Sequence, residues 1–141
     1  MPMLTVRDLM TTDVTTLQVE VTVDKAAELM RAQDIGDVVV ADANTVVGLV
    51  TDRDIVVRAV AEGRDPASTT LGSIVSKDLV TVLPDDSAAD AARLMRDKAV
   101  RRVLVLDDNG GLLGILSIGD LAADIDPESV LGGISTAAPN N

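Results

Sequence analysis

The chain has 141 residues, of which 47% are hydrophobic, and its net charge is −11. It contains no Phe, Trp, Tyr, Cys or His, so its core must be aliphatic, and thiolate or imidazole metal sites, disulfides and His-assisted nucleophiles are excluded. The acidic balance disfavours nucleic acids and anionic membranes as partners, and no apolar stretch reaches the roughly 18 residues of a membrane span.

The chain repeats itself at a spacing of 65 residues. Three pairs of segments align at this spacing: 5–14 with 70–79, 26–31 with 91–96, and 38–40 with 103–105. After one inserted residue, Gly48-Leu-Val-Thr-Asp-Arg-Asp-Ile aligns with Gly114-Ile-Leu-Ser-Ile-Gly-Asp-Leu at a spacing of 66. An insertion in a Gly/Asn turn between elements that keep their register is typical of a hairpin loop. The chain is therefore a duplication.

The duplication predicts two domains and two flanking segments. We expect a first repeat over residues 5–63, a linker over 64–69, a second repeat over 70–125 and a loosely ordered tail over 126–141. Each repeat has the pattern of a lead-in helix, a strand, a helix, two strands and a closing helix, which predicts an α/β fold.

The elements of the second repeat follow from local patterns. Ser87-x-x-Asp90 has the form of a capping box and predicts a helix that runs to about Lys98. The sequence then predicts a strand over 100–106, a turn at Asp107-Asp-Asn-Gly-Gly, a strand over 112–116 and a helix over 117–124. The first repeat follows the same order, with a turn at 42–44 and a helix end before Gly63.

The closing helix of the first repeat is unusually apolar. In Ile55-Val-Val-Arg-Ala-Val-Ala the apolar residues cover nearly the whole circumference, which predicts burial on more than one side. One side can pack on its own sheet, and the other on the second repeat or on a second chain. We expect a homodimer, because twofold association of one apolar patch is the commonest solution.

The aligned endings at Gly48 and Gly114 resemble the G-hydrophobic-hydrophobic-[ST]-x-x-D-[IL] ending of the CBS domain. Other pieces resemble the same family: the helix start at 6–10, Val80-Thr-Val, the Ala-Ala-x-Leu-Met helix and the strand at 100–107. The resemblance covers residue 5 to about 125 in two complete copies. It implies two β-α-β-β-α units packed sheet to sheet about a pseudo-twofold axis, with two clefts between them. Such pairs typically bind AMP, ADP, ATP or sometimes S-adenosylmethionine, and small stand-alone chains of this kind often form homodimers.

Two short motifs are the first candidate ligand residues. Thr51-x-x-Asp54 and Ser117-x-x-Asp120 are both [ST]-x-x-[DE] boxes at strand-to-helix junctions, which is sufficient to explain them as helix caps. The resemblance implies that the Asp accepts hydrogen bonds from ribose hydroxyls and that the Thr or Ser helps to hold ribose or phosphate. The two interpretations are compatible.

A basic pair distinguishes the second repeat from the first. Arg101 and Arg102 end a run of basic residues, with Arg93, Arg96 and Lys98 before them. They fall where the family commonly has a phosphate-contacting residue, although a solvated pair on a strand edge is the alternative. Gly36 and Asp37 stand at the equivalent positions of the first repeat. A carboxylate there lowers affinity for phosphate, so we expect inequivalent clefts.

The remaining candidates are the walls of an adenine pocket that the resemblance implies. Thr16 and Thr81 lie on the first strand of each repeat, where the family contacts adenine largely through backbone groups. The apolar walls could come from Val14, Ile35, Leu79 and Val100. The alternative for these residues is that they are simply core.

The function predicted from the sequence is a non-catalytic regulatory module that binds an adenosine nucleotide and transmits the binding to an unknown protein partner. The alternative is a ligand-free structural or protein-interaction dimerisation module. Catalysis is poorly supported, because without His or Cys it would need a carboxylate or Lys acid–base pair. We expect no obligatory cofactor, no metal, and, from the absence of Cys and of a signal peptide, a cytoplasmic protein.

Overall fold

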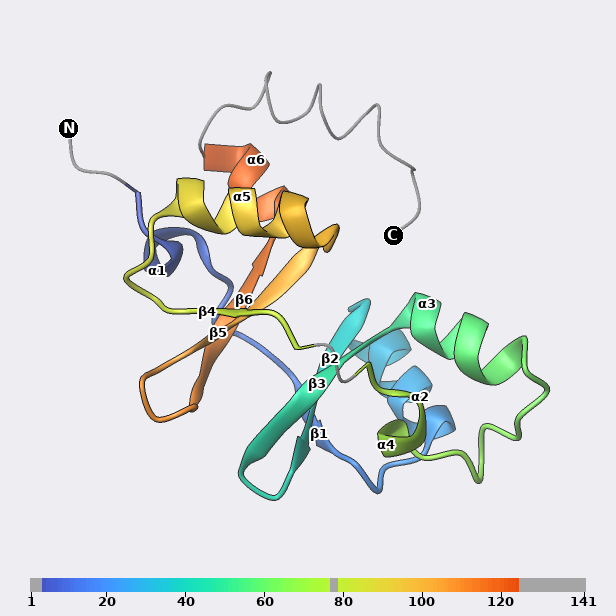
Figure 1. Cartoon of the computed structure of the whole chain (residues 1–141). Coiled ribbons are helices and arrows are strands. Elements are labelled where there is room, and N and C mark those ends of the chain that lie inside the picture. The colour runs from blue at the N-terminus through green and yellow to red at the C-terminus, as the bar shows by residue number, and fades with distance from the viewer. Residues whose placement is uncertain (1–3, 77–78, 125–141) are drawn as a thin grey trace. The chain divides into compact units, whose positions relative to one another are not determined.

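The computed structural model describes residues 4–76 and 79–124 and divides into two compact units (Figure 1). One unit is residues 14–79, which we call the middle unit. The other combines residues 1–13 with 80–141, and we call it the terminal unit. The tail predicted over 126–141 lies outside the described residues.

Each unit contains one three-stranded sheet and helices packed on it, so the predicted α/β fold and the duplication are confirmed. The middle unit contains β1 (Thr16–Gln18), α2 (Val23–Gln33), β2 (Asp37–Asp42), β3 (Thr45–Thr51), α3 (Asp52–Ile55), the π-helical turn η1 (Val56–Val60) and α4 (Leu71–Ile74). The terminal unit contains α1 (Val6–Leu9), β4 (Thr81–Val82), α5 (Ala88–Lys98), β5 (Arg102–Leu106), β6 (Leu112–Ser117) and α6 (Ile118–Asp124). In each sheet the first strand runs parallel to the second, and the third runs antiparallel to the second.

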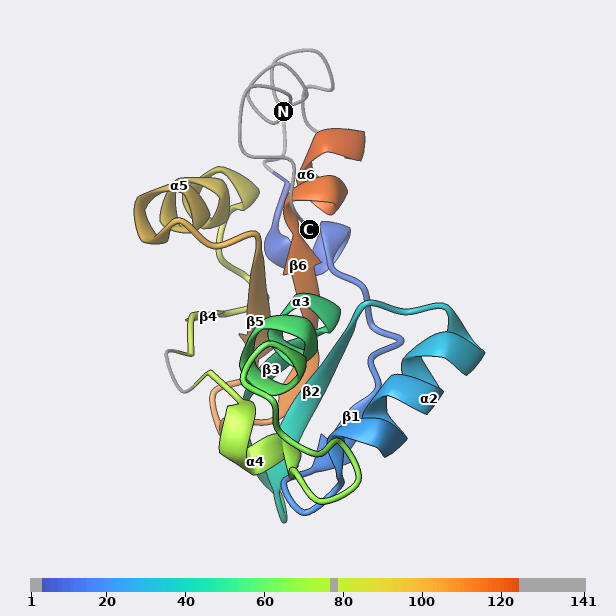
Figure 2. The same ribbon diagram turned by 90° about the vertical axis from the view of Figure 1, so that its right-hand side faces the viewer.

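The inserted residue lies in the second hairpin, as the change of spacing predicts. Ala41 pairs with Val46 in the first hairpin, and the equivalent Leu106 pairs with Leu112 in the second, so the second loop is one residue longer. Gly110 has a φ of 82° there, a conformation that favours glycine. Strand β5, which was predicted over 100–106, begins at Arg102. Figure 2 shows β5 and β6 running side by side below α5 and α6.

Each unit has its own aliphatic core. In the middle unit, Val38, Val40 and Val50 of the sheet pack against Ala26 and Met30 of α2, all at most 7% exposed. The terminal unit repeats the arrangement with Val103, Val105, Leu116, Ala91 and Met95. Because no core residue carries a hydroxyl or indole N–H, the cores contain no side-chain polar group that needs a partner.

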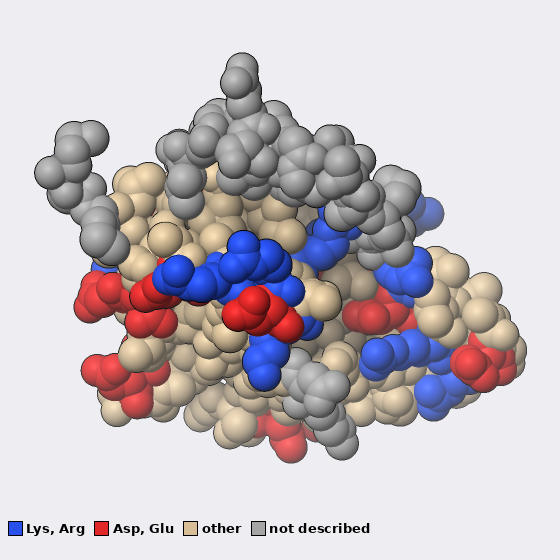
Figure 3. All heavy atoms as spheres, turned by 45° about the horizontal axis from the view of Figure 1, so that its top comes forward, with Lys and Arg blue, Asp and Glu red and all other residues tan. Residues whose placement is uncertain are grey.

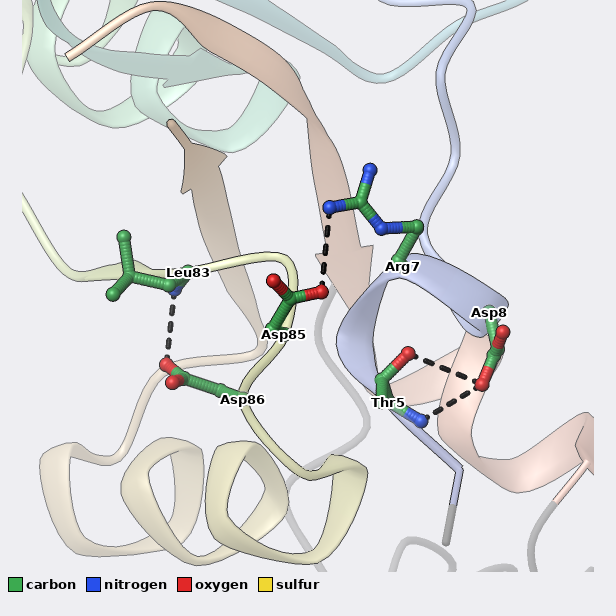
Figure 4. Close-up of polar contacts among 6 residues, drawn as sticks. All are labelled: Thr5, Arg7, Asp8, Leu83, Asp85 and Asp86. Atoms are coloured by element: carbon green, nitrogen blue, oxygen red, sulfur yellow. Dashed lines mark hydrogen bonds and ion pairs between the residues drawn. The ribbon is translucent and has the colours of Figure 1, made fainter. Parts of the chain in front are cut away.

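The lead-in helices pack in the unit of the other repeat. Helix α1, from the first repeat, packs in the terminal unit, where the Val6 N–H donates to the Asp86 carbonyl at 2.9 Å and Arg7 pairs with Asp85 at 3.3 Å (Figure 4). Helix α4, from the second repeat, packs in the middle unit, where the Leu71 N–H donates to the Val21 carbonyl at 2.8 Å. The compact units therefore do not coincide with the sequence repeats.

The exchange of the lead-in helices between the units explains the glycine that begins the repeated motif, Gly48 in one copy and Gly114 in the other. The segment after α4 forms a bridge between Ser76 and Leu49 on the edge of β3. A Cβ on Gly48 would lie 2.3 Å from the Ser76 carbonyl oxygen, and a Cβ on Gly114 would lie 2.5 Å from the Thr11 carbonyl oxygen. Both glycines are thus required by close approach of another backbone.

The apolar closing helix of the first repeat differs from the expectation. It contains a wide π-helical turn, closed by the Ala61 N–H donating to the Val56 carbonyl at 2.8 Å. Ile55 and Ala59 are buried, but Val56, Val57 and Val60 are 57%, 44% and 58% exposed. One side of the helix, with Ile55 and Ala59, is therefore buried as expected, and packing of its other side on a second chain stays a prediction.

The capping box predicted at the start of α5 is only half formed. The Ser87 hydroxyl accepts the Asp90 N–H at 3.0 Å, as expected. The Asp90 carboxylate instead accepts a hydrogen bond from Arg93 one turn along the helix. Arg93, together with Ser87, lowers the Asp90 pKa below its ordinary value of 3.8.

Candidate functional site

The candidate residues of the middle unit meet at one end of its sheet. Strand β2 begins where β3 ends, so Asp37 lies directly opposite Thr51. The Asp52 N–H donates to the Gly36 carbonyl at 2.9 Å, which fixes the start of α3 beside the start of β2. Asp54 follows in the first turn of α3. Thr51 and Asp54 are called the Asp54 site below.

The terminal unit has the same arrangement with different side chains. Arg102 lies directly opposite Ser117, and the Ile118 N–H donates to the Arg101 carbonyl at 3.0 Å. Asp120 follows in the first turn of α6. Ser117 and Asp120 are called the Asp120 site. Register thus places the two predicted arginines beside this site.

Both sites form complete capping boxes. The Thr51 N–H donates to Asp54 Oδ2 at 2.9 Å, and the Asp54 N–H donates to Thr51 Oγ1 at 3.1 Å. The Ser117 N–H donates to Asp120 Oδ2 at 2.9 Å, and the Asp120 N–H donates to Ser117 Oγ at 3.1 Å. The capping interpretation is therefore confirmed for both motifs, and each carboxylate has lone pairs beyond those that the box uses.

A third box shows how much of this geometry is structural. In α1 the Thr5 N–H donates to Asp8 Oδ2 at 2.9 Å (Figure 4). This bond is the main reason that the Asp8 pKa lies below 3.8, with the Thr5 hydroxyl as a second cause. Asp8 is exposed, whereas Asp54 and Asp120 are half-buried. A box alone therefore does not identify a ligand site, and position at the sheet end distinguishes the other two.

The basic run is divided by the structure. Arg93, Arg96 and Lys98 are exposed on α5, with Arg93 paired to Asp90 and Arg96 Nε 3.9 Å from Asp97 Oδ1. Figure 3 shows blue Lys and Arg atoms bordered by red acidic ones. Arg101 and Arg102 are half-buried and make interactions of their own, so they differ in exposure from the three basic residues on α5.

The predicted pocket walls fall into two groups. Ile35 and Val100 are partly buried and pack against the two cores, which supports the core alternative for them. Thr16 and Thr81 are exposed and pair with Val39 and Leu104 on the neighbouring strands. Val14 is half-buried and Leu79 is 37% exposed.

Arg58 was not among the predicted site residues. It lies in η1, four residues after Asp54, and its Nε is 4.0 Å from Asp54 Oδ1. Its Nη1 also donates to the Ile74 carbonyl at 3.0 Å. The i, i+4 spacing of Asp54 and Arg58 on a helix could have identified the pair from the sequence.

Within residues 4–76 and 79–124, no cluster of three or more acidic side chains is arranged to hold a metal ion. None of the helices in these residues has the length and hydrophobicity needed to cross a bilayer.

The chain resembles known proteins over nearly its whole length. Residues 6–60 and 71–126 each match the CBS domain. The CBS domain-containing protein YhcV of Bacillus subtilis is 38% identical over 122 residues, which are 86% of each chain. A hexameric CBS-CP12 protein from bloom-forming cyanobacteria is 31% identical with a TM-score of 0.78, over 88% of this chain and 69% of that one. The CBS domain pair of protein MJ0100, solved with 5′-methylthioadenosine and S-adenosyl-L-methionine, has a TM-score of 0.76 at 22% identity, over 94% and 98% of the chains, which is a likeness of fold.

Proposed function

The chain belongs to the CBS domain family, and from that premise we propose that it is a non-catalytic regulatory module that binds an adenosine nucleotide such as AMP, ADP or ATP. In this proposal, binding shifts the population of two conformations and so changes the affinity for a protein partner in the cytoplasm. The absence of Cys supports the cytoplasmic location.

One observation carries the proposal. Both units place a half-buried carboxylate at the same end of the sheet, with Oδ2 held by a backbone N–H. A carboxylate has about four lone-pair positions, so each keeps some for a ligand. An ionised carboxylate accepts hydrogen bonds only, and a ribose diol supplies two hydroxyl donors side by side. The adenosyl ligands of the MJ0100 pair carry the same diol, which supports this class of ligand.

The two sites differ in the charge beside them, and we propose that they bind nucleotides unequally. Arg102 lies opposite Ser117, whereas Asp37 lies opposite Thr51. Guanidinium groups bind phosphate through two parallel hydrogen bonds, and a carboxylate repels it. The Asp120 site should therefore hold a phosphorylated ligand better, with a Kd in the range of about 1 μM to 1 mM, or about −8 to −4 kcal/mol.

The test is calorimetric titration of the full chain with AMP, ATP and S-adenosylmethionine. We expect binding to the wild-type chain, a loss of about tenfold or more in ATP affinity for Asp120→Ala, and a smaller loss for Asp54→Ala. Asp8→Ala is the matched control, because it removes the same kind of box from α1, and it should leave the affinity unchanged.

Two results would contradict the proposal. If none of the ligands at millimolar concentration gives heat or raises the Tm, the chain is a ligand-free interaction module. If Asp54→Ala and Asp120→Ala weaken ATP binding equally, the sites bind nucleotides and are equivalent.

We also propose a homodimer formed through the exposed valines of η1. Val56, Val57 and Val60 account for three of the six large hydrophobic side chains that are exposed among the described residues. Covering a Val fully is worth about 1.5 kcal/mol or more, and twofold pairing of one apolar patch is the commonest form of self-association. The hexameric CBS-CP12 protein supports self-association in this family without identifying the surface.

A further inference from the structure

Arg58 is held beside Oδ1 of Asp54 by two contacts of its guanidinium. Its Nη1 donates to the carbonyl of Ile74 at the end of α4, and its Nε lies 4.0 Å from Asp54 Oδ1. The side chain is 46% exposed and that of Asp54 is 23% exposed. The guanidinium is therefore anchored on one edge and open to solvent on another.

The two repeats carry opposite charges at two equivalent positions. Asp37 of the first repeat aligns with Arg102 of the second, at the start of the central strand. Arg58 aligns in sequence with Asp124, four residues after Asp120. Each repeat thus has one acid and one base at these positions, in reversed places.

We infer that Arg58 is the anion-binding residue of the Asp54 site, which selects a ribosyl ligand that carries a phosphate or a carboxylate. The inference rests on the proposed function, in which Asp54 holds a ribose. Oδ2 already accepts the Thr51 N–H, and Oδ1 lies 4.0 Å from Arg58 Nε. A diol that binds this carboxylate through Oδ1 therefore lies next to the guanidinium, where an anion on the same ligand can reach it. A guanidinium has five N–H donors, and the two contacts of Arg58 leave others for an anion.

The position of Arg58 compensates for Asp37. With a carboxylate at the start of β2, the Asp54 site lacks the cation that Arg102 gives the Asp120 site. Arg58 supplies a cation from the helical side instead. The sites then differ in the direction from which the positive charge comes, and each can take an anionic ligand.

A purely structural role for Arg58 makes a different prediction. Arg58 joins η1 to α4, so its loss would lower the Tm and weaken charged and neutral ligands alike. An anion-binding role changes the ratio of affinities for a charged ligand and its neutral counterpart. AMP and adenosine form such a pair, because they share the ribose diol and differ by the phosphate.

The experiment compares Arg58→Gln with Arg53→Gln in the full chain, each in an Asp120→Ala background that removes the other site. Arg53 is an exposed arginine on the same helical segment, which makes it the matched control. Calorimetry with adenosine, AMP and S-adenosylmethionine gives the affinities. If the background substitution prevents folding, the shifts of the Thr51 and Asp54 amides by NMR report the same site in the otherwise unmodified chain.

We expect Arg58→Gln to lower the AMP-to-adenosine affinity ratio about tenfold and Arg53→Gln to change it less than twofold. A loss for S-adenosylmethionine in place of AMP would identify a carboxylate as the preferred anion. An unchanged ratio with intact adenosine binding would overturn the inference and leave the proposed function standing. Absence of binding to the wild-type chain would overturn both.

Discussion

The middle and terminal units have the same three strands in the same order, yet they differ where function is expected. Their cores are interchangeable in character, aliphatic and free of polar side chains. Their sites differ in charge. Asp37 and Arg58 of the first repeat align with Arg102 and Asp124 of the second. The duplication thus preserved the packing and let the charges diverge. The difference teaches that the sequence positions which break the repeat are the ones to test for ligand selectivity.

The largest effect is expected from removing a lead-in helix contact. Leu71 of α4 is fully buried in the core of the middle unit, and Leu→Ala at such a position costs about 3 kcal/mol of unfolding free energy. Leu71→Ala should therefore speed amide hydrogen exchange in β1, β2 and β3.

Val6→Ala is the reciprocal variant, because Val6 of α1 is fully buried in the terminal unit. It should speed exchange in β4, β5 and β6 instead. Faster exchange in the strands of the variant's own sequence repeat would show that the lead-in helices are not exchanged in solution.

An intermediate effect is expected at the closing helices, where the units differ in exposure. Val56 is 57% exposed in η1, whereas the equivalent Ala122 of α6 is 6% exposed. If the valines form the dimer interface, Val60→Asp should weaken self-association by about tenfold or more, because it buries an unpaired charge. Sedimentation equilibrium measures the dissociation constant.

Leu83→Asp serves as the control for that variant, since Leu83 is 44% exposed in the terminal unit and lies outside the patch. It should leave the dimer intact. Equal effects of the two variants, or none for Val60→Asp, would exclude the η1 surface as the interface.

The smallest effect is expected from pH, which should change the stability of lead-in helix α1 more than that of α4. The Thr5 N–H and hydroxyl hold the Asp8 pKa below 3.8 in the folded chain, so this bond stabilises α1 above pH 3.8 and is lost as the pH falls through the folded pKa. Helix α4 has no such carboxylate, because Ser73 stands at the equivalent position and donates to the Thr70 carbonyl at 2.7 Å.

Acid should therefore speed exchange of the Met10 amide in α1 more than that of the Val75 amide in α4. Thr5→Ala should raise the Asp8 pKa part of the way, because the backbone N–H remains; an NMR titration of the carboxyl carbon measures it. A pKa unchanged by Thr5→Ala would show that the hydroxyl does not contribute.

Much of the architecture was predictable because it depends on local patterns. The repeat spacing predicted the order of elements, and the change from 65 to 66 placed the insertion in a hairpin loop. The box motifs at Thr51 and Ser117 predicted caps that form with the expected bonds. Strand register then brought Arg102 beside Ser117, as the resemblance to the CBS domain had suggested.

Other features depend on tertiary context that one sequence does not encode locally. A repeat pattern does not say which copy a lead-in helix packs on, so the exchange of α1 and α4 was not predictable. The π-helical turn has no composition that distinguishes it from an α-helix of valines, and it left Val56, Val57 and Val60 exposed. Comparison of the repeats does not indicate Arg58 as a site residue, because the equivalent position of the second repeat is the acidic Asp124.

The exchanged lead-in helices also determine an order of folding. The middle unit is continuous in the chain, so during synthesis it has all its parts once residue 79 has emerged. The terminal unit needs α1 from the beginning of the chain and strands that are made last. Closing so long a loop is slow in a disordered chain, and prior folding of the middle unit shortens the disordered part of that loop. We therefore expect the middle unit to fold first and the terminal unit to be completed last.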